Sequence, residues 1–432
     1  MGSNKYELIG TLTGTGARRR RNLVVVATAV FFVGAFSLAL KLDSMRITSI
    51  LRTPCNPYAQ HGRLIVDEGN PHANRWHPFG SGNECTQPGP ALAAAFLRAS
   101  WANTPPSKGS STGNLWADEE VGPDGRPWSD VSWAQNRTVL YLGDSVARYK
   151  TAYLCEMAGE ELIELNWTHP WSPPQIFKDG STAPSAPGYE GMDPFGWHKL
   201  PPGEAHTHIG HYCYVPGLDF LLVHLHSYGL DQEGYFEDRD SYFPPYTFEE
   251  RLHGLAVPWI QAIRDSKRRT ESAPELIYLH SALWDAMRWA KEDMNSPVGD
   301  NEERLGWYRH RIREATLATA DAFPKAALYW STTHYPIRPS TGWFFPGVEP
   351  HKRPELKLLR LAEMQAAALS AFDSKDVPRD VGKVLGKVKV NWWGTAVVGQ
   401  EEHQVDDLHP SFLPSGYLWA DMMLYDLRDV VA

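Results

Sequence analysis

The sequence predicts an α/β fold built on a central, mainly parallel sheet. From residue 137 onward, short apolar runs alternate with stretches of helical periodicity, which is typical of strands connected by helices. Each apolar run is almost continuous rather than alternating with polar residues. We therefore expect helices to cover both faces of the sheet.

The predicted elements follow one another along a domain that spans residues 137–432. The sequence favours strands at 138–143, 161–167, 218–226, 275–280, 326–334 and 387–393. It favours helices near 145–158, 247–267, 302–322, 355–373 and 414–428. Residues 41–136 are rich in Gly, Pro, Asn and Trp, with one helical pattern near 91–103. They predict a stalk followed by a loop-rich, cysteine-bearing subdomain.

A membrane segment is predicted near the N-terminus. Residues 23–40 carry no charge and directly follow four arginines at 18–21. A helix of this length rises about 27 Å, which is enough to cross a thin bilayer. The positive-inside rule then predicts a cytoplasmic tail at 1–22, a signal anchor at 23–40 and a lumenal remainder. We therefore expect a single-pass type II protein of the Golgi or another secretory-pathway membrane. A cleaved signal peptide is the alternative, and it delivers residues 41–432 to the same compartment.

Cysteine and sequon content agree with a lumenal address. The even number of cysteines suits disulfides in an oxidising compartment, and proximity favours pairing Cys55 with Cys85 and Cys155 with Cys213 among the three possible pairings. Two sequons make Asn136 and Asn166 candidate glycosylation sites. With 51 acidic against 42 basic side chains, a nucleic-acid partner is not expected.

The first chemical motif is Gly143-Asp144-Ser145, at the end of the first predicted strand of this domain. A serine on a tight turn from strand to helix exposes its hydroxyl above the carboxyl edge of the sheet. The free N–H groups of the helix N-terminus suit an oxyanion there. Taken alone, the motif is equally compatible with an N-capped helix that has no chemistry.

The second motif, Asp406-Asp407-Leu408-His409, precedes the last predicted helix. A serine nucleophile needs a base, and a histidine base needs a carboxylate on its other ring nitrogen. The spacing favours Asp406 as that carboxylate, with Asp407 as the adjacent alternative. By itself this motif is also compatible with a capped helix entry, but the two motifs together predict a Ser–His–Asp set.

These motifs resemble the GDSL/SGNH superfamily, and the match is closest to its PC-esterase branch. That branch includes the plant trichome birefringence-like polysaccharide O-acetyltransferases and related fungal and animal proteins. The run Gly-Asp-Ser-x-x-Arg, which ends at Arg148, is similar to the form of the plant members. The resemblance covers roughly residues 55–430. It implies a three-layer SGNH-hydrolase-like fold, Ser145 as nucleophile, His409 as base and Asp406 as the residue that orients it.

The sequence departs from the superfamily in the glycine and Gly-x-Asn-Asp blocks that supply oxyanion donors. The corresponding places are occupied by the segments around Gly229 and around Trp284-Asp285. The candidates for oxyanion or substrate binding are therefore Gly143, Asp144, Arg148, Gly229, Trp284 and Asp285.

Other histidines have no assigned role. His206, His208 and His211 form a run, but its spacing matches no known metal site, so we predict no metal. His224, His226, His280 and His334 lie at predicted strand ends, where they either line the cleft or pack in the core. The proline-rich stretch 170–216 is too long for an ordinary connection and predicts a loop over the substrate.

The sequence thus predicts transfer of an acyl group, acetyl by the resemblance, through a seryl intermediate to a hydroxyl of a glycan or polysaccharide. No tightly bound cofactor is expected, and an acetyl donor such as acetyl-CoA is a co-substrate. The alternatives are a glycan acetyl esterase, in which water accepts the acyl group, and a non-catalytic glycan-binding protein on the same fold.

Overall fold

The computed structural model describes most of the chain beyond residue 55. The described residues are 56–59, 61–67, 74–79, 92–104, 131–165, 169–172, 175–176, 182–183, 209–235, 247–294, 302–337, 348–352, 358–375, 377–406 and 408–431. Residues Asn56–Ala432 belong to one compact unit. The predicted membrane segment at 23–40 lies outside the described residues, and none of the helices within them is long and apolar enough to cross a bilayer.

The centre of the fold is a seven-stranded sheet in the order β11-β10-β9-β3-β8-β7-β4. The strands are β3 (Thr138–Gly143), β4 (Leu162–Glu164), β7 (Gly210–Val215), β8 (Phe220–His226), β9 (Leu276–Leu279), β10 (Ala327–Ser331) and β11 (Lys389–Asn391). β8, β3, β9, β10 and β11 pair in parallel, whereas β7 is antiparallel to both of its neighbours. The predicted α/β fold with a mainly parallel sheet is confirmed.

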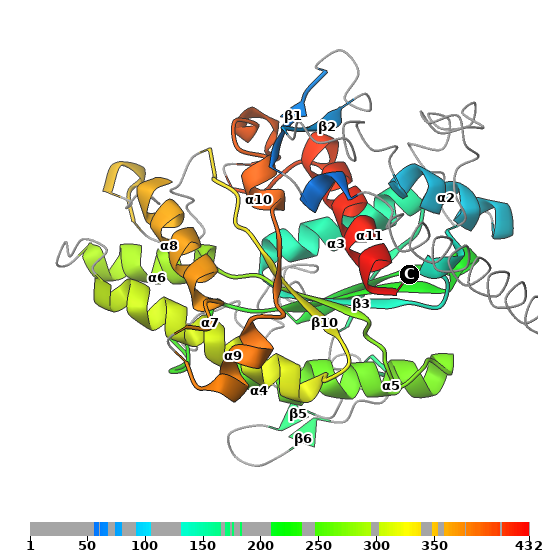
Figure 1. Ribbon diagram of the computed structural model, residues 1–432, viewed down its shortest axis with the longest axis horizontal. Helices are drawn as coiled ribbons and strands as arrows, with labels where there is room; N and C mark the ends of the chain where they lie inside the picture. Colours follow the sequence, from blue (N-terminus) through cyan, green and yellow to red (C-terminus); the bar gives the residue numbers. More distant parts are fainter. Residues whose placement is uncertain are drawn as a thin grey trace, which may run out of the picture. The chain divides into compact units, whose positions relative to one another are not determined.

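Helices cover both faces of this sheet, as its apolar strands require. Figure 1 shows α2, α3 and α11 on one side of the sheet and α4, α5 and α7 on the other. The helices are α2 (Leu92–Asn103), α3 (Ser145–Ala158), α4 (Phe248–Arg251), α5 (Val257–Lys267), α6 (Leu283–Asp293), α7 (Glu302–Ala322), α8 (Leu358–Ala371), α9 (Arg379–Leu385), α10 (Trp393–Ala396) and α11 (Tyr417–Val431). A π-helical turn at Leu252–Ala256 joins α4 and α5 into one helical segment.

The six predicted strands and the predicted helices are found, with shifts of a few residues at their ends. β7 is an addition, because it begins inside the stretch 170–216 that the sequence assigned to a covering loop. α6 and the short helix α9 were also not predicted. Of the rest of that stretch, the structure describes a small hairpin of β5 (Gln175–Ile176) and β6 (Thr182–Ala183).

One cross-strand row of polar and aromatic residues runs through the whole sheet. Each strand contributes one residue, and neighbouring members are paired in register: Glu164, His211, His224, Tyr141, Tyr278, Tyr329 and Lys389. The rings of Tyr141 and Tyr278 are 5.3 Å apart. The row carries charges on the two edge strands and aromatic or imidazole rings between them.

The described residues before β3 belong to the same compact unit as the sheet. A two-stranded hairpin joins β1 (Gly62–Ile65) and β2 (Arg75–Pro78). α2 and Tyr58 both reach α11, because Asp421 accepts hydrogen bonds from the Ala93 amide and from the Tyr58 hydroxyl. The predicted disulfide Cys155–Cys213 is present and links α3 to β7. This bond indicates an oxidising environment, as in the secretory pathway. Cys55 and Cys85 lie outside the described residues.

Candidate active site

The Gly143-Asp144-Ser145 turn connects the end of β3 to the start of α3. Asp144 is the N-cap of the helix, and its Oδ1 accepts a hydrogen bond from the Val146 amide at 2.9 Å. Ser145 is then the first helical residue, at a position where backbone N–H groups have no partner within the helix. A side chain on Gly143 would meet Ala147 Cβ at 2.9 Å, so the tight turn requires glycine there.

The Asp406–His409 loop brings its two motif side chains to this turn. His409 Nε2 lies 2.7 Å from Ser145 Oγ, and His409 Nδ1 lies 2.8 Å from Asp406 Oδ2. The other Asp406 oxygen accepts the backbone amides of Leu408 at 2.7 Å and His409 at 2.6 Å. A continuous hydrogen-bonded chain therefore runs from the serine hydroxyl to the carboxylate. Asp407, the alternative partner, lies outside the described residues.

Several contacts from other elements hold this loop in place. After β10, His334 Nε2 donates a hydrogen bond to Leu408 O at 2.6 Å. Gln404 bridges the same segment, because its side chain donates to Tyr335 O and accepts from the Ile337 amide. On the helix side, Tyr153 OH donates to Pro410 O at 2.7 Å.

The electrostatics favour an ionised Asp406. Partial burial raises the pKa of this carboxyl, but hydrogen bonds from His409 and the nearby amides outweigh it and bring the pKa to about 2. The ring of Tyr149 stacks on His409 with 4.5 Å between centroids. Both Tyr149 and Arg148 follow Ser145 by about one helical turn, so they lie on the same side of α3.

Arg148 places a cation beside this site. Burial lowers its pKa, and the charges of Tyr149, Asp144 and Asp406 oppose that shift. In the part of the chain that the structure describes, the guanidinium forms no ion pair with Asp144 or Asp406. The guanidinium lies over the Tyr149 ring at 5.4 Å.

The predicted oxyanion candidates Gly229, Trp284 and Asp285 lie together. Gly229 has φ of +81°, and a Cβ there would come within 2.5 Å of Asp285 Oδ1. That oxygen accepts the Leu230 amide at 2.9 Å, and Oδ2 accepts the Ser281 hydroxyl. Burial raises the pKa of Asp285 to about 6. Trp284 is buried, and its ring lies edge-on to Tyr228. The cluster thus joins the loops after β8 and β9.

Two of the strand-end histidines contact the turn that carries Ser145. His224 Nε2 donates to both Gly143 O and Asp144 O at 3.2 Å, while His280 Nδ1 lies 3.4 Å from Asp144 Oδ1. Burial lowers the pKa values of His224 and His334 to about 3, so both rings are neutral. Of the core and cleft roles that the sequence left open, the buried positions of these histidines favour a supporting one.

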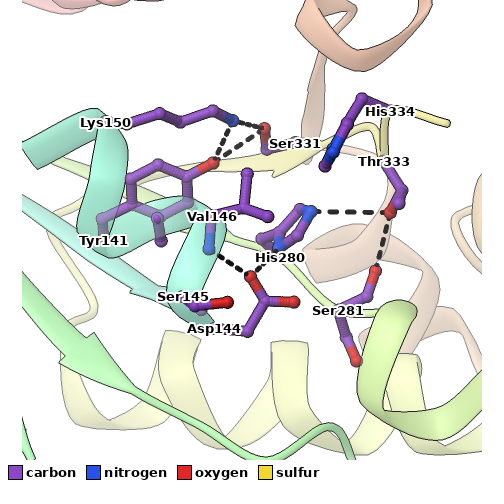
Figure 2. Close-up of polar contacts among 12 residues, drawn as sticks. Tyr141, Asp144, Ser145, Val146, Lys150, His280, Ser281, Ser331, Thr333 and His334 are labelled. Carbon is purple, nitrogen blue, oxygen red and sulfur yellow. Dashed lines mark hydrogen bonds and ion pairs between the residues drawn. The ribbon is translucent and has the colours of Figure 1, made fainter. Parts of the chain in front are cut away.

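A buried lysine, Lys150, anchors the other side of α3. Its amine donates to Tyr141 OH at 2.8 Å and lies 3.5 Å from the centre of the Trp393 ring. Figure 2 shows it reaching toward Tyr141 and Ser331, on the strands β3 and β10. Burial keeps the pKa of this amine well below its usual range. No local sequence pattern predicts this buried position of Lys150, since a lysine near a helix N-terminus normally faces solvent.

The remaining candidate residues are only partly described. Asn136 is exposed, and its side-chain oxygen accepts a hydrogen bond from Arg269 at 2.9 Å. Asn166, His206 and His208 lie outside the described residues, and His211 is buried in β7. Within the described ranges, no group of three or more His, Cys, Asp or Glu side chains is arranged to hold a metal ion.

The fold and this site define an α/β protein with a hydrogen-bonded Ser–His–Asp set at the carboxyl edge of its sheet. No protein-family model and no curated protein matches the sequence. One solved crystal structure, of an uncharacterised chain, has 16% sequence identity to this chain, covering 69% of it and 100% of its own length, with a TM-score of 0.30.

Proposed function

We propose that this protein is a serine-dependent acyl-transfer enzyme. The observation that carries the proposal is the chain of contacts from Ser145 Oγ to His409 Nε2 and from His409 Nδ1 to Asp406 Oδ2, at 2.7 and 2.8 Å. These are the distances that a nucleophile, its base and the residue that orients the base require. Ser145 is also partly exposed, which leaves its hydroxyl open to a substrate.

In the proposed reaction Ser145 Oγ attacks the carbonyl carbon of an acyl donor. Its proton moves to His409 Nε2, and the same proton then goes to the leaving group as the bond between carbonyl carbon and leaving group breaks. An acceptor hydroxyl next attacks the acyl-enzyme, gives its proton to His409 and releases Ser145 with the proton restored. Asp406 stays ionised and stabilises the protonated imidazole throughout.

Two groups are candidates for donating hydrogen bonds to the oxyanion of the tetrahedral intermediate. The Ser145 amide lies at the N-terminus of α3, where it has no partner within the helix and where the helix dipole favours negative charge. The Arg148 guanidinium is a second candidate, since no carboxylate in the described residues pairs with it. Losing one donor of this kind typically costs about 2.7–4 kcal/mol of transition-state stabilisation.

The finer proposal is an SGNH-like enzyme of the PC-esterase type that moves acetyl groups onto glycan hydroxyls. It is supported by the resemblance at GDSVAR and DDLH, and by the Cys155–Cys213 bond, which suits the compartment where glycans are built. Hydrolysis by the same residues is the alternative, because transfer and hydrolysis differ only in the acceptor. Non-catalytic glycan binding is the second alternative.

The test compares the purified full-length wild type with Ser145→Ala, using a chromogenic acetyl ester with and without candidate oligosaccharides. Ser266→Ala is the matched control, because Ser266 is an exposed residue of α5 on the other side of the sheet. We expect both chromophore release and acetylated sugar in the wild type and the control, and neither in Ser145→Ala. Acid release without a sugar product would assign an esterase. Activity that survives in Ser145→Ala would overturn the proposal.

A further inference from the structure

One side of α3 carries a row of residues that meets the loop with His409. Ser145, Tyr149 and Tyr153 are spaced by four positions, so their side chains lie on the same side of the helix. The rings of Tyr149 and Tyr153 are 5.8 Å apart. The row thus extends for two helical turns from the proposed nucleophile.

Tyr153 fixes the far end of this row against the loop. Its hydroxyl donates a hydrogen bond to Pro410 O at 2.7 Å, and its ring lies 5.7 Å from the ring of Phe412. A Cβ on Gly416 would come within 2.4 Å of the same ring, so the backbone of the loop lies directly against it. The loop is therefore held against this side of the helix.

The ring of Tyr149 stacks on the ring of His409. Their centroids are 4.5 Å apart, and the angle between their planes is 27°. The two hydrogen-bonding nitrogens of His409 lie 2.8 Å from Asp406 Oδ2 and 2.7 Å from Ser145 Oγ. A tilt of the imidazole about the line through these nitrogens would leave both contacts intact. The ring of Tyr149 blocks this tilt, because it occupies the space on that face of the imidazole.

The hydroxyl of Tyr149 takes no part in this contact. Within the described residues, no hydrogen bond joins it to another side chain or to the backbone. Tyr149 is also partly exposed, whereas Tyr153 is buried. The ring is therefore the part of Tyr149 that acts on His409, and a phenylalanine at this position retains it.

The face of an aromatic ring attracts a positive charge. In the proposed reaction His409 takes the proton of Ser145 and carries a positive charge until it gives that proton to the leaving group. A cation within about 6 Å of the centre of a tyrosine ring is stabilised by the electron-rich face of the ring. Asp406 compensates the same charge from the edge of the imidazole, so the carboxylate and the ring face act from different directions.

We propose that Tyr149 is a positioning residue for His409. Its ring holds the imidazole in the orientation that reaches Ser145 Oγ, and its face stabilises the charge that His409 carries during proton transfer. Tyr149 acts through His409 and does not touch the reacting atoms. This inference rests on the proposed function for its effect on turnover.

The first test measures kcat and KM of the full-length protein with an activated acetyl ester. Tyr149→Phe keeps the ring, whereas Tyr149→Leu and Tyr149→Gln lack it and suit a helix. We expect the two variants without a ring to lower kcat by about 5–30-fold with little change in KM, which is the range of a partly desolvated cation–π contact. Tyr149→Phe should stay within about threefold of the wild-type kcat.

Tyr214→Leu is the matched control. Tyr214 is a partly buried tyrosine on β7, and its ring contacts Lys267. It pairs with Leu221, which pairs with Thr138 at the start of β3, so it lies toward the edge of the sheet away from Ser145. This variant should keep the wild-type kcat and KM.

Three kinetic results would overturn the role of Tyr149. A rise in KM at unchanged kcat would assign its side chain to substrate binding. An equal loss in Tyr149→Phe and Tyr149→Leu would assign the effect to the hydroxyl. Wild-type kcat in the variants without a ring would leave Tyr149 with a packing role only.

A second readout separates this inference from the proposed function. Methanesulfonyl fluoride modifies an activated serine: the Oγ–S bond forms, the S–F bond breaks, fluoride leaves and the serine proton goes to the base. The rate at Ser145, followed by intact mass, should fall by about 5–30-fold in Tyr149→Leu and stay near wild type in Tyr149→Phe. A wild type that turns over no ester refutes the proposed function, and these rates then still decide the role of Tyr149. Equal rates in wild type and Tyr149→Leu, or no modification of the wild type, refute that role.

Discussion

Asp426 ties the last helix, α11, to two strands of the sheet. Its Oδ2 accepts hydrogen bonds from Tyr278 OH on β9 at 2.7 Å and from Asn391 Nδ2 on β11 at 2.6 Å. Burial raises its pKa to about 7; the two hydrogen bonds oppose this shift and the charge of Asp429 adds to it. We predict that Asp426→Asn removes a pH-dependent part of the free energy of unfolding.

The size of this effect on the free energy of unfolding follows from the pKa shift of Asp426. An aspartate in an unfolded chain has a pKa of about 3.9, so the shift is about 3 units, at about 1.36 kcal/mol each. Because the folded protein holds this proton more tightly, the stabilisation of about 4 kcal/mol is complete below about pH 3.9 and is lost as the pH rises through about 7. Between about pH 5 and about pH 8 the wild type loses about 3 kcal/mol that Asp426→Asn keeps.

The assay is urea unfolding of the wild type and Asp426→Asn at these two pH values, with the free energy of unfolding taken from midpoint and slope. We expect the variant to gain about 3 kcal/mol relative to wild type on going from the lower to the higher pH. Asp380→Asn, at an exposed position on α9, should follow the wild type at both. An equal difference between Asp426→Asn and wild type at the two pH values refutes the reasoning.

Three further predictions concern the site and its supports. Asp406→Asn should lower kcat by about 10²–10⁴-fold, because the imidazole beside it loses the carboxylate that sets its tautomer. His334→Phe leaves Leu408 O without its donor, so we expect a loss of about 1–3 kcal/mol in unfolding free energy together with reduced kcat; His334→Gln, which retains an N–H donor, should lose less. Replacing Cys155 and Cys213 together by alanine should cost about 4 kcal/mol, since their bond spans 58 residues. Equal denaturant midpoints for that variant and the wild type would contradict the last expectation.

The parts of the fold that local sequence pattern determines were predicted well. β3 and α3 are found at the predicted residues, because a fully buried apolar run is followed by an N-cap and a helical pattern. β7 was not predicted, since it lies in a segment rich in prolines and glycines and its pairing depends on β4 and β8. α6, which begins at Leu283, is not predicted because the sequence around Trp284-Asp285 is interpreted as part of a binding block.

For the candidate site, sequence motifs located the proposed Ser–His–Asp set but not the residues that contact it from other segments. Ser145, Asp406 and His409 lie together as the two motifs predicted, although their catalytic role stays a prediction. The contacts of His334 and His280 join segments that are far apart in the chain, so no local pattern reveals them. The same is true of Gly229 and Asp285, two predicted oxyanion candidates that lie close together although they are far apart in the chain.

The cross-strand row has a consequence for how the chain finds its native pairing. A shift of one residue in any strand turns its row member to the opposite face of the sheet. Tyr141 would then lose the amine of Lys150, and Tyr278 would lose the carboxylate of Asp426, leaving buried polar groups without partners. A shift in the register of any of these strands is therefore unfavourable. The exposed charge of Lys389 on the edge strand β11 also discourages a further strand from adding at that edge.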